Sequence, residues 1–355
     1  ADITRLPTPI WTVGADPAPF LTAGCVVTKD PDTGIRNVGT YRVQIKGPRK
    51  LGLFISYLQG GRDHVEKNNR AGKPTPVAIV MGTDPVIGLV SVSRVQADMD
   101  ELAVAGRLSG EAVQVVRCQT VDLEVPATAE VVIEGLIRAN ELEHEGPFGD
   151  YTGYVSPATM SYVVDVTCIT HRNQPIVQAF LSQMPPSESS CVRSIGREST
   201  LFKHLKEDLR LPVRDVHLTE SSGGAAYLVI SIRKTHPVQP RTVMFAAWGH
   251  SPQFGKFTVV VDDDVDVRDP NEVNWALSFC VQPEKDTFVV SGTQPVSLDP
   301  SLAPPGGPPE TYTRGVSSKL GIDATRKHQY PPLAQPPSEH LERVRQNWKK
   351  YGFQD

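Results

Sequence analysis

The chain has 355 residues, of which 39% are hydrophobic and 21% charged; this is an ordinary globular composition, and the length predicts two domains. The 36 basic residues against 40 acidic ones give a net charge of −4, which points to neither a nucleic acid nor a membrane surface as partner. No apolar run is long enough to span a membrane, and five scattered cysteines without C-x-x-C spacing predict buried free thiols and a cytoplasmic location.

The first half of the chain alternates short apolar runs with turn residues, a pattern typical of β-strands. Strands are predicted at 21–28, 35–45, 51–58, 76–82, 112–119, 129–136, 162–170 and 175–181, and helices at 61–72 and 98–108. Gly39 interrupts the second strand and predicts a bulge or bend there. Because long helices are rare between these strands, we predict a mainly antiparallel, barrel-like sheet. Residues 1–20 are rich in proline and lack an initial methionine, as expected inside a longer polypeptide.

After about Ser182 the pattern changes, because helical periodicity now alternates with strands. Helices are predicted at 200–211 and 270–280, strands at 226–232, 243–248 and 257–262, and a long loop at 294–309. The second of these helices has Asp269 as its cap and Pro270 in its first turn. The last helix, 338–351, places Leu341, Val344, Trp348 and Tyr351 on one stripe. The alternation predicts an α/β domain, and the stripe is typical of a helix that docks on another domain or subunit.

The most informative stretch runs from Glu141 to Tyr154 and reads E-L-E-H-E-G-P-F-G-D-Y-T-G-Y. Gly-Pro and Phe-Gly indicate turns. Glu145 and Asp150 flank these turns, so we predict that two carboxylates face each other across a glycine-lined bend. If half buried, such a pair can share one proton and exchange it near neutral pH. The alternative is a solvated acidic hairpin without a chemical role.

Other patterns are less specific. The acidic run 261–269 offers oxygen ligands for Mg²⁺, but acids between a strand and a capped helix also serve turns and caps. Lys319 lies in 313–321, a run of small residues with two cations that predicts a phosphate-binding loop. The sequence contains no P-loop, dinucleotide-binding, nucleophile-elbow or H-E-x-x-H motif.

Three stretches together resemble the UbiD family of prenylated-flavin-dependent carboxylases and decarboxylases. They are 32–42 (D-T-G-I-R-N-V-G-T-Y-R), 122–130 (D-L-E-V-P-A-T-A-E) and 145–154 (E-G-P-F-G-D-Y-T-G-Y), and 261–266 and 317–325 fit as well. The resemblance is nearly end to end and in order. It implies a mixed α+β fold, with a split β-barrel flavin-binding domain over 1–182 and an α/β C-terminal oligomerisation domain with a terminal helix over 183–355. It also implies a further N-terminal domain, absent before residue 1 of this chain.

The resemblance implies a catalytic set made of Arg42, Glu145 and Asp150, with aspartate as the second acid. Arg42 would bind the substrate carboxylate, and Asp150 would deliver the proton that replaces CO₂. Met184 and Pro185 are expected to line the substrate pocket.

The resemblance further implies a cofactor site. The family metal, Mn²⁺ or Mg²⁺, takes an Asn, a His and a Glu, and Asn37 and Glu101 match the first and the last. The histidine position departs from the pattern, because Leu58 stands there with Gln59 beside it. The nearest imidazole is that of His64, our candidate third ligand. The side chains expected to bind the cofactor are those of Asn37, Arg42, Glu101 and Lys319. Lys319 is similar to the family lysine that contacts the flavin phosphate.

The activity implied is reversible, non-oxidative decarboxylation of an aromatic, heteroaromatic or α,β-unsaturated acid on prenylated FMN, with Mn²⁺ or Mg²⁺ and K⁺ as a further candidate ion. The implied partners are the small acid itself, a flavin prenyltransferase that supplies the cofactor, and further copies of the chain in a dimer or hexamer. Two other functions stay open at this point: a non-catalytic or assembly subunit of a decarboxylase complex, and an FMN-dependent oxidoreductase on a split barrel.

Overall fold

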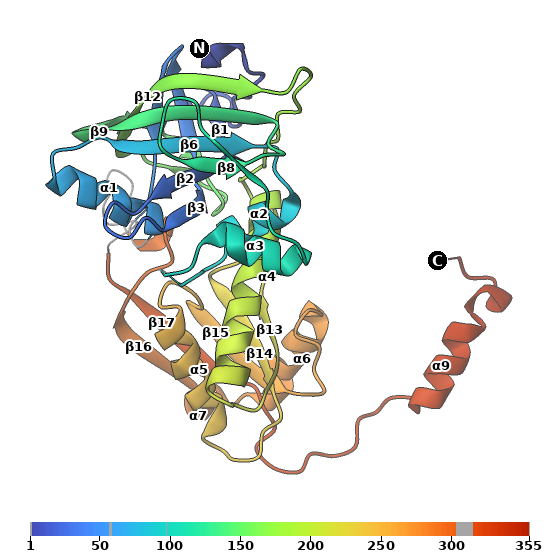
Figure 1. The fold of residues 1–355 in the computed structure, drawn as a ribbon. Coiled ribbons are helices and arrows are strands. Elements are labelled where there is room, and N and C mark those ends of the chain that lie inside the picture. Colours follow the sequence, from blue (N-terminus) through green and yellow to red (C-terminus); the bar gives the residue numbers. More distant parts are fainter. Residues whose placement is uncertain (1, 57–58, 97, 303–314, 355) are drawn as a thin grey trace. The chain divides into compact units, whose positions relative to one another are not determined.

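The computed structural model describes residues 2–56, 59–96, 98–302 and 315–354. Contacts divide the chain into a main unit, Ala1–Thr325, and a C-terminal unit, Arg326–Asp355, which we describe separately. The main unit is built on two large sheets (Figure 1). In the described ranges, no helix combines the length and the apolar character needed to cross a membrane.

The first sheet has eight antiparallel strands in the order β1-β4-β5-β12-β9-β6-β2-β3. Their bounds are β1 Phe20–Leu21, β2 Cys25–Lys29, β3 Arg36–Thr40, β4 Val43–Gly47, β5 Lys50–Leu53, β6 Thr75–Met81, β9 Val131–Glu145 and β12 Thr159–His171. Two short ladders join β7 Val115–Arg117 to β8 Glu124–Pro126 and β10 Phe148–Gly149 to β11 Val155–Ser156. The mixed α+β class is therefore confirmed. In the described ranges no ladder joins the edge strands β1 and β3, so the split-barrel form stays a prediction.

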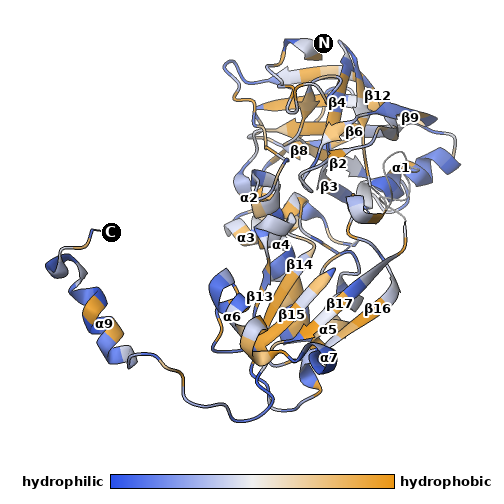
Figure 2. Cartoon of the chain, turned by 180° about the vertical axis from the view of Figure 1, so that it is seen from behind, coloured by the Kyte–Doolittle hydropathy of each residue, from blue (hydrophilic) through white to orange (hydrophobic). Residues whose placement is uncertain are grey.

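Alternate residues along these strands face two separate cores, as the pleat of a strand requires. Ile79 and Ile133 belong to one core, whereas their neighbours Val80 and Val132 belong to the other. The second core is shared with two short helices, α2 Pro85–Ser91 and α3 Glu101–Ser109. The helix α1, Gly60–Arg70, precedes β6 and buries Val65 in the first core. Apolar side chains are thus buried on both sides of the sheet, and hydrophobic residues recur along its strands in Figure 2.

The second sheet has five strands in the order β13-β14-β15-β17-β16, with a parallel centre made by β14, β15 and β17. The strands are β13 Val213–Leu218, β14 Tyr227–Ile232, β15 Phe257–Asp262, β16 Thr287–Thr293 and β17 Ser317–Asp323. The helices are α4 Glu188–Lys203 with a π-helical continuation His204–Asp208, α5 Gln239–His250, α6 Pro270–Cys280 and α7 Pro283–Asp286. Residues of α4 and α5 pack with Leu228 and Ile230, whereas residues of α6 pack with Val229. Helices therefore cover both faces of this sheet, as expected for parallel strands.

Two predicted strands are wrong. Residues 243–248 lie in α5, where Val243, Met244, Ala247 and Trp248 are buried at helical spacing. Residues 175–181 form no strand, because backbone N–H groups in this stretch bond to side chains, as Phe180 does to Thr22, rather than to a neighbouring strand.

Smaller corrections concern exposure and length. The helix predicted at 200–211 begins at Glu188. Leu108 and Leu209, which lie in the ranges predicted as helices, are exposed. Of the five free cysteines, Cys25 and Cys280 are buried, but Cys191 is exposed. The strand predicted to 58 ends at Leu53, and residues 57–58 lie outside the described ranges.

The C-terminal unit contains a helix, α9 Ser338–Gln346, and a 3-10 turn, Trp348–Tyr351. Each residue of the predicted stripe has an exposed fraction of about two fifths or more. These residues are Leu341, Val344, Trp348 and Tyr351. Docking of this stripe on another subunit stays a prediction.

Candidate active site

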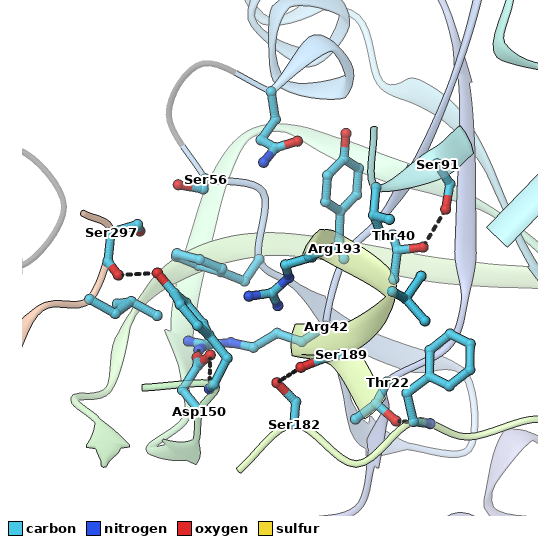
Figure 3. A pocket seen from close by; sticks show the side chains of 18 of the residues that line it. Thr22, Thr40, Arg42, Ser56, Ser91, Asp150, Ser182, Ser189, Arg193 and Ser297 are labelled. Carbon is cyan, nitrogen blue, oxygen red and sulfur yellow. Dashed lines mark hydrogen bonds and ion pairs between the residues drawn. The ribbon is translucent and has the colours of Figure 1, made fainter. Parts of the chain in front are cut away.

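A pocket of about 200 Å³ lies in the main unit (Figure 3). Some of its lining residues belong to the first sheet and to the turn after β9, and others belong to α4 and to nearby loops. The lining includes Thr40, Arg42, Gln59, Ser91, Phe148, Asp150, Tyr151, Arg193 and Arg197. The pocket is rich in hydroxyl groups and cations, so it suits an anionic ligand with several hydrogen-bond acceptors.

Arg42 joins the two predicted carboxylates. Its Nε and Nη2 donate to the two carboxylate oxygens of Glu145 at 2.9 and 2.8 Å, and its Nη1 donates to Asp150 at 2.8 Å. A further bond from Nη1 reaches the hydroxyl of Ser156 at 3.0 Å. The structure therefore brings the three predicted residues together, with Arg42 and Asp150 at the pocket surface and Glu145 behind them.

The chain places Arg42 by breaking strand pairing at Tyr41 and Arg42, between β3 and β4. The break is therefore not at Gly39, which is paired with Val26 inside β3. Gly39 serves another purpose: a Cβ there would lie 2.3 Å from the Tyr41 hydroxyl. Its lack of a side chain leaves room for the Tyr41 ring, while Arg42 turns toward Glu145.

Burial controls the electrostatics of this cluster. The side chain of Glu145 is fully buried, and those of Arg42 and Asp150 are each 8% exposed. Burial raises the pKa of Glu145 above its ordinary value, and the charge of Arg42 offsets only part of this effect. Burial would lower the pKa of Arg42, but the charges of Glu145 and Asp150 raise it overall. The buried carboxyl group of Glu145 therefore holds a proton more readily than an exposed glutamate does, even with Arg42 beside it.

Other residues support the turn, and the sequence did not single them out. Asp16 is buried and accepts bonds from the backbone N–H groups of Thr12 and Gly149. A Cβ at Gly149 would lie 2.0 Å from the Thr12 hydroxyl, so the segment 11–16 packs directly on the turn. Ser156, which accepts from Arg42, donates to the carbonyl of Phe148. No local sequence signal marks Asp16, because it reaches the turn from a distant part of the chain.

The two predicted metal ligands with oxygen donors also meet. The Asn37 amide donates to the Glu101 carboxylate at 2.7 Å, and the Tyr41 hydroxyl donates to the Asn37 carbonyl oxygen at 3.2 Å. Burial raises the pKa of Glu101, although the backbone N–H of Val38 also donates to it. Among described residues, no group of three His, Cys, Asp or Glu side chains is arranged to hold a metal ion.

The remaining predicted site residues lie elsewhere. His64 is buried with its Nδ1 at 2.9 Å from the Thr28 hydroxyl and its Nε2 at 4.0 Å from Asp30. Lys319 is not in a loop: it lies in β17, its ammonium donates to the Phe254 carbonyl, and burial lowers its pKa to about 8. Leu58 lies outside the described residues.

Met184 and Pro185, expected to line the pocket, do not belong to its described lining. They pack against Gly153 instead, where a Cβ would lie 2.9 Å from the Met184 sulfur. The nearby residues Ser182 and Ser189 are pocket residues. The acidic run 261–269 contains a turn and the helix cap Asp269, whose side chain accepts from the Asn271 N–H, as the capping alternative predicted.

Comparison with known families identifies the class of protein. Residues 1–185 match the 3-octaprenyl-4-hydroxybenzoate carboxy-lyase Rift-related domain, and residues 190–324 match the C-terminal domain of the same carboxy-lyases. The chain belongs to the UbiD family. The predicted boundary after residue 182 is not tested by these matches and stays a prediction.

Individual relatives agree with this assignment. The UbiD-class enzyme HmfF from Pelotomaculum thermopropionicum, solved with FMN, is 35% identical with a TM-score of 0.84, over 96% of this chain and 74% of that one. Vanillic acid decarboxylase of Sedimentibacter hydroxybenzoicus, in closed form, has a TM-score of 0.84 at 29% identity, over 97% of this chain and 73% of that one. The uncharacterised Synechocystis protein sll0936 is 33% identical over all of this chain and 70% of its own length. The chain spans between 63% and 74% of the length of such relatives.

Proposed function

We propose that this protein decarboxylates an aromatic, heteroaromatic or α,β-unsaturated carboxylic acid, reversibly and without net oxidation, using prenylated FMN. The observation that carries the proposal is the bridge from Arg42 to both Glu145 and Asp150 at the surface of a pocket. Family membership supports the reaction class, and HmfF has been solved with FMN and, in an evolved dimeric form, with prFMN.

Asp150 is the proton donor in this proposal. One of its oxygens accepts from Arg42 and the other from the backbone N–H of Tyr151 at 2.8 Å, so its carboxyl group is held in place at the pocket. Glu145 has no access to the pocket but shares Arg42 with Asp150. Loss of a proton from Asp150 to the substrate carbon leaves a carboxylate that Arg42 stabilises. The reverse transfer would serve carboxylation.

The geometry changes the role first expected for Arg42. Four of its five N–H groups already donate, two to Glu145 and one each to Asp150 and Ser156. Arg42 therefore lacks the pair of free N–H groups needed to grip a substrate carboxylate. Its function in the proposal is to position the two acids and to set their proton affinity.

The chain offers suitable groups for the cofactor. The helix α1 begins near Asn37 without a side-chain cap, and Gln59, Ser91 and Thr40 line the pocket. Uncapped N–H groups and hydroxyls bind phosphate well, and the oxygens of Asn37 and Glu101 suit Mn²⁺ or Mg²⁺ once the Asn37 amide turns. The bound flavin would supply the electron sink for decarboxylation. Roles of His64 and Lys319, a K⁺ site, a flavin prenyltransferase as cofactor supplier, and a homo-oligomer remain parts of the proposal.

The test is CO₂ release by protein purified from cells that also produce a flavin prenyltransferase. Aryl and unsaturated acids are supplied without a nicotinamide donor. Glu145→Gln and Asp150→Asn should each lower turnover at least ~10²-fold, because general acid catalysis contributes roughly 10²- to 10⁴-fold. Their flavin content and circular dichroism should stay the same.

Glu143→Gln is the matched control, since it makes the same substitution two residues away on β9, outside the pocket lining. It should keep near wild-type turnover. Near wild-type CO₂ release by Asp150→Asn would show that Asp150 is not the proton donor. A flavin-loaded protein that releases no CO₂ but oxidises a nicotinamide donor would instead be an oxidoreductase.

A further inference from the structure

Two arginines on α4, Arg193 and Arg197, line the same pocket as Arg42. They are four residues apart and therefore lie on one face of the helix. Figure 3 shows Arg193 extending from the helix toward the part of the pocket where Arg42 and Asp150 lie. Neither belongs to the proton-donor cluster, so their presence needs a separate reason.

Both guanidinium groups are held by aromatic rings rather than by acids. The Arg193 guanidinium lies 4.3 Å from the ring centre of Tyr151, and that of Arg197 lies 4.5 Å from the ring centre of Phe254. In the described part of the chain neither forms an ion pair, and Arg197 donates one bond, to the Gly224 carbonyl at 2.9 Å. A guanidinium stacked on a ring keeps its N–H groups directed outward in its own plane, where they can bind a carboxylate.

The pocket also has more positive than negative side chains. Arg42, Arg193 and Arg197 bring three guanidinium groups to the pocket, whereas the carboxylates of Glu145 and Asp150 both pair with Arg42, so positive charge is left over. Burial, together with the charge of Arg193, lowers the pKa of Arg197 to about 9, and the side chain still carries its charge at neutral pH. A buried cation without an acid is costly, and an anionic ligand would offset that cost.

We propose that Arg193 and Arg197 form a subsite for a second acidic group of the substrate, so that the preferred substrate is an aromatic dicarboxylate. Arg193 stacks on Tyr151, the residue that follows Asp150, which places the subsite next to the proton donor. One carboxylate then stays with the arginines while the other reacts. This inference rests on the proposed decarboxylase function and specifies its substrate class.

The first test needs no variant. Flavin-loaded protein is given benzoate, benzene-1,3-dicarboxylate, benzene-1,4-dicarboxylate and the mono-methyl esters of the two diacids. Binding is measured by calorimetry on the Asp150→Asn protein, and kcat/KM from CO₂ release on the unaltered protein. A diacid should bind roughly 10- to 100-fold more tightly than its half ester, the range expected for charge-assisted hydrogen bonds. Equal binding of diacid and half ester would overturn the inference.

Variants then locate the subsite. Arg193→Gln and Arg197→Gln should each reduce the preference for diacid over half ester about tenfold, whereas Arg193→Lys should retain part of it. The flavin content per protein should not change. The matched control is Arg241→Gln, since Arg241 also stacks on a ring, that of Phe288, but is exposed and outside the pocket lining.

The outcomes separate the possible sources of the anion. If flavin content falls in the arginine variants while the diacid preference persists, the arginines bind the cofactor phosphate and the inference is wrong. If benzoate or a half ester is decarboxylated as efficiently as a diacid, only the inference fails. If no acid of any kind releases CO₂, the proposed function itself fails.

Discussion

The pocket is lined by two kinds of arginine. Arg42 has two acidic partners that accept from three of its N–H groups, and a fourth N–H donates to Ser156. Arg193 and Arg197 instead stack on aromatic rings and have no acidic partner among the described residues. The difference separates two tasks. A guanidinium whose N–H groups mostly donate to acids fixes the positions and the proton affinity of those acids. A guanidinium with several free N–H groups can bind an anion that arrives from solution.

The same difference predicts opposite effects on stability. Removing Arg42 would leave two buried carboxylates without a cation, and removing one member of a buried pair is strongly destabilising. Removing Arg197 would take away a partly buried cation and would leave no described acid without its partner. Binding sites often carry such unfavourable charges until the ligand is present.

The largest effect is expected for Arg42→Met. Because Glu145 is fully buried, the free energy of unfolding at pH 7 should fall by ~3–5 kcal/mol. The stranded acids would take up protons more readily in the folded than in the unfolded state, so the loss should shrink as the pH falls toward 5. Urea unfolding followed by circular dichroism at both pH values measures this.

The control for that variant is Arg138→Met. Arg138 also bonds to two acids, Asp165 and Glu141, but its side chain is 36% exposed. Water screens such pairs, so the loss of stability should be much smaller than for Arg42→Met. Equal losses for Arg42→Met and Arg138→Met would mean that burial does not set the energy of the Arg42 cluster.

A smaller effect of opposite sign is expected for Arg197→Met. Loss of the bond to the Gly224 carbonyl costs about 1 kcal/mol, but removal of a desolvated cation relieves a somewhat larger cost. In protein without flavin or substrate, the net result should be a stabilisation of ~1 kcal/mol, seen as a higher urea midpoint. A lower midpoint would show that the Gly224 bond and the Phe254 ring together outweigh the burial of the charge.

The sequence predicted Arg42 and its two acids but not the other two arginines of the pocket. Glu145, Asp150 and Arg42 lie in stretches that carry a family resemblance, and the structure brings the three together. Arg193 and Arg197 were not singled out, because four-residue spacing of arginines is common on exposed helix faces. Their place in the pocket depends on how α4 packs against Tyr151 and Phe254, and a local sequence pattern does not predict such long-range contacts.

The fold shows the same limit. Strands made of a short, nearly continuous apolar run, such as β6 and β15, were predicted within a residue or so, and most residues of both are buried. The stretch 243–248 was assigned as a strand although it is helical, since a short apolar run does not distinguish a buried strand from a buried helix. Lys319 was assigned to a loop because its neighbours are small, yet pairing with β15 and β16 makes its segment a strand.

The smallest effect is expected at Glu143, which lies two residues before Glu145 on β9 but is 31% exposed. Hydrogen bonds from Lys50 and then Lys46 lower the pKa of Glu143 to about 2, opposite in direction to the shift of Glu145. A folded-state pKa below the unfolded value of 4.5 stabilises the fold above about pH 4.5, and this contribution is lost as the pH falls toward 2. Glu143→Gln should therefore lower the free energy of unfolding by ~0.5 kcal/mol at pH 7, less at high salt, and by nearly nothing at pH 2. Urea unfolding across this pH range tests it, and a difference that did not change with pH would place the effect in packing rather than in charge.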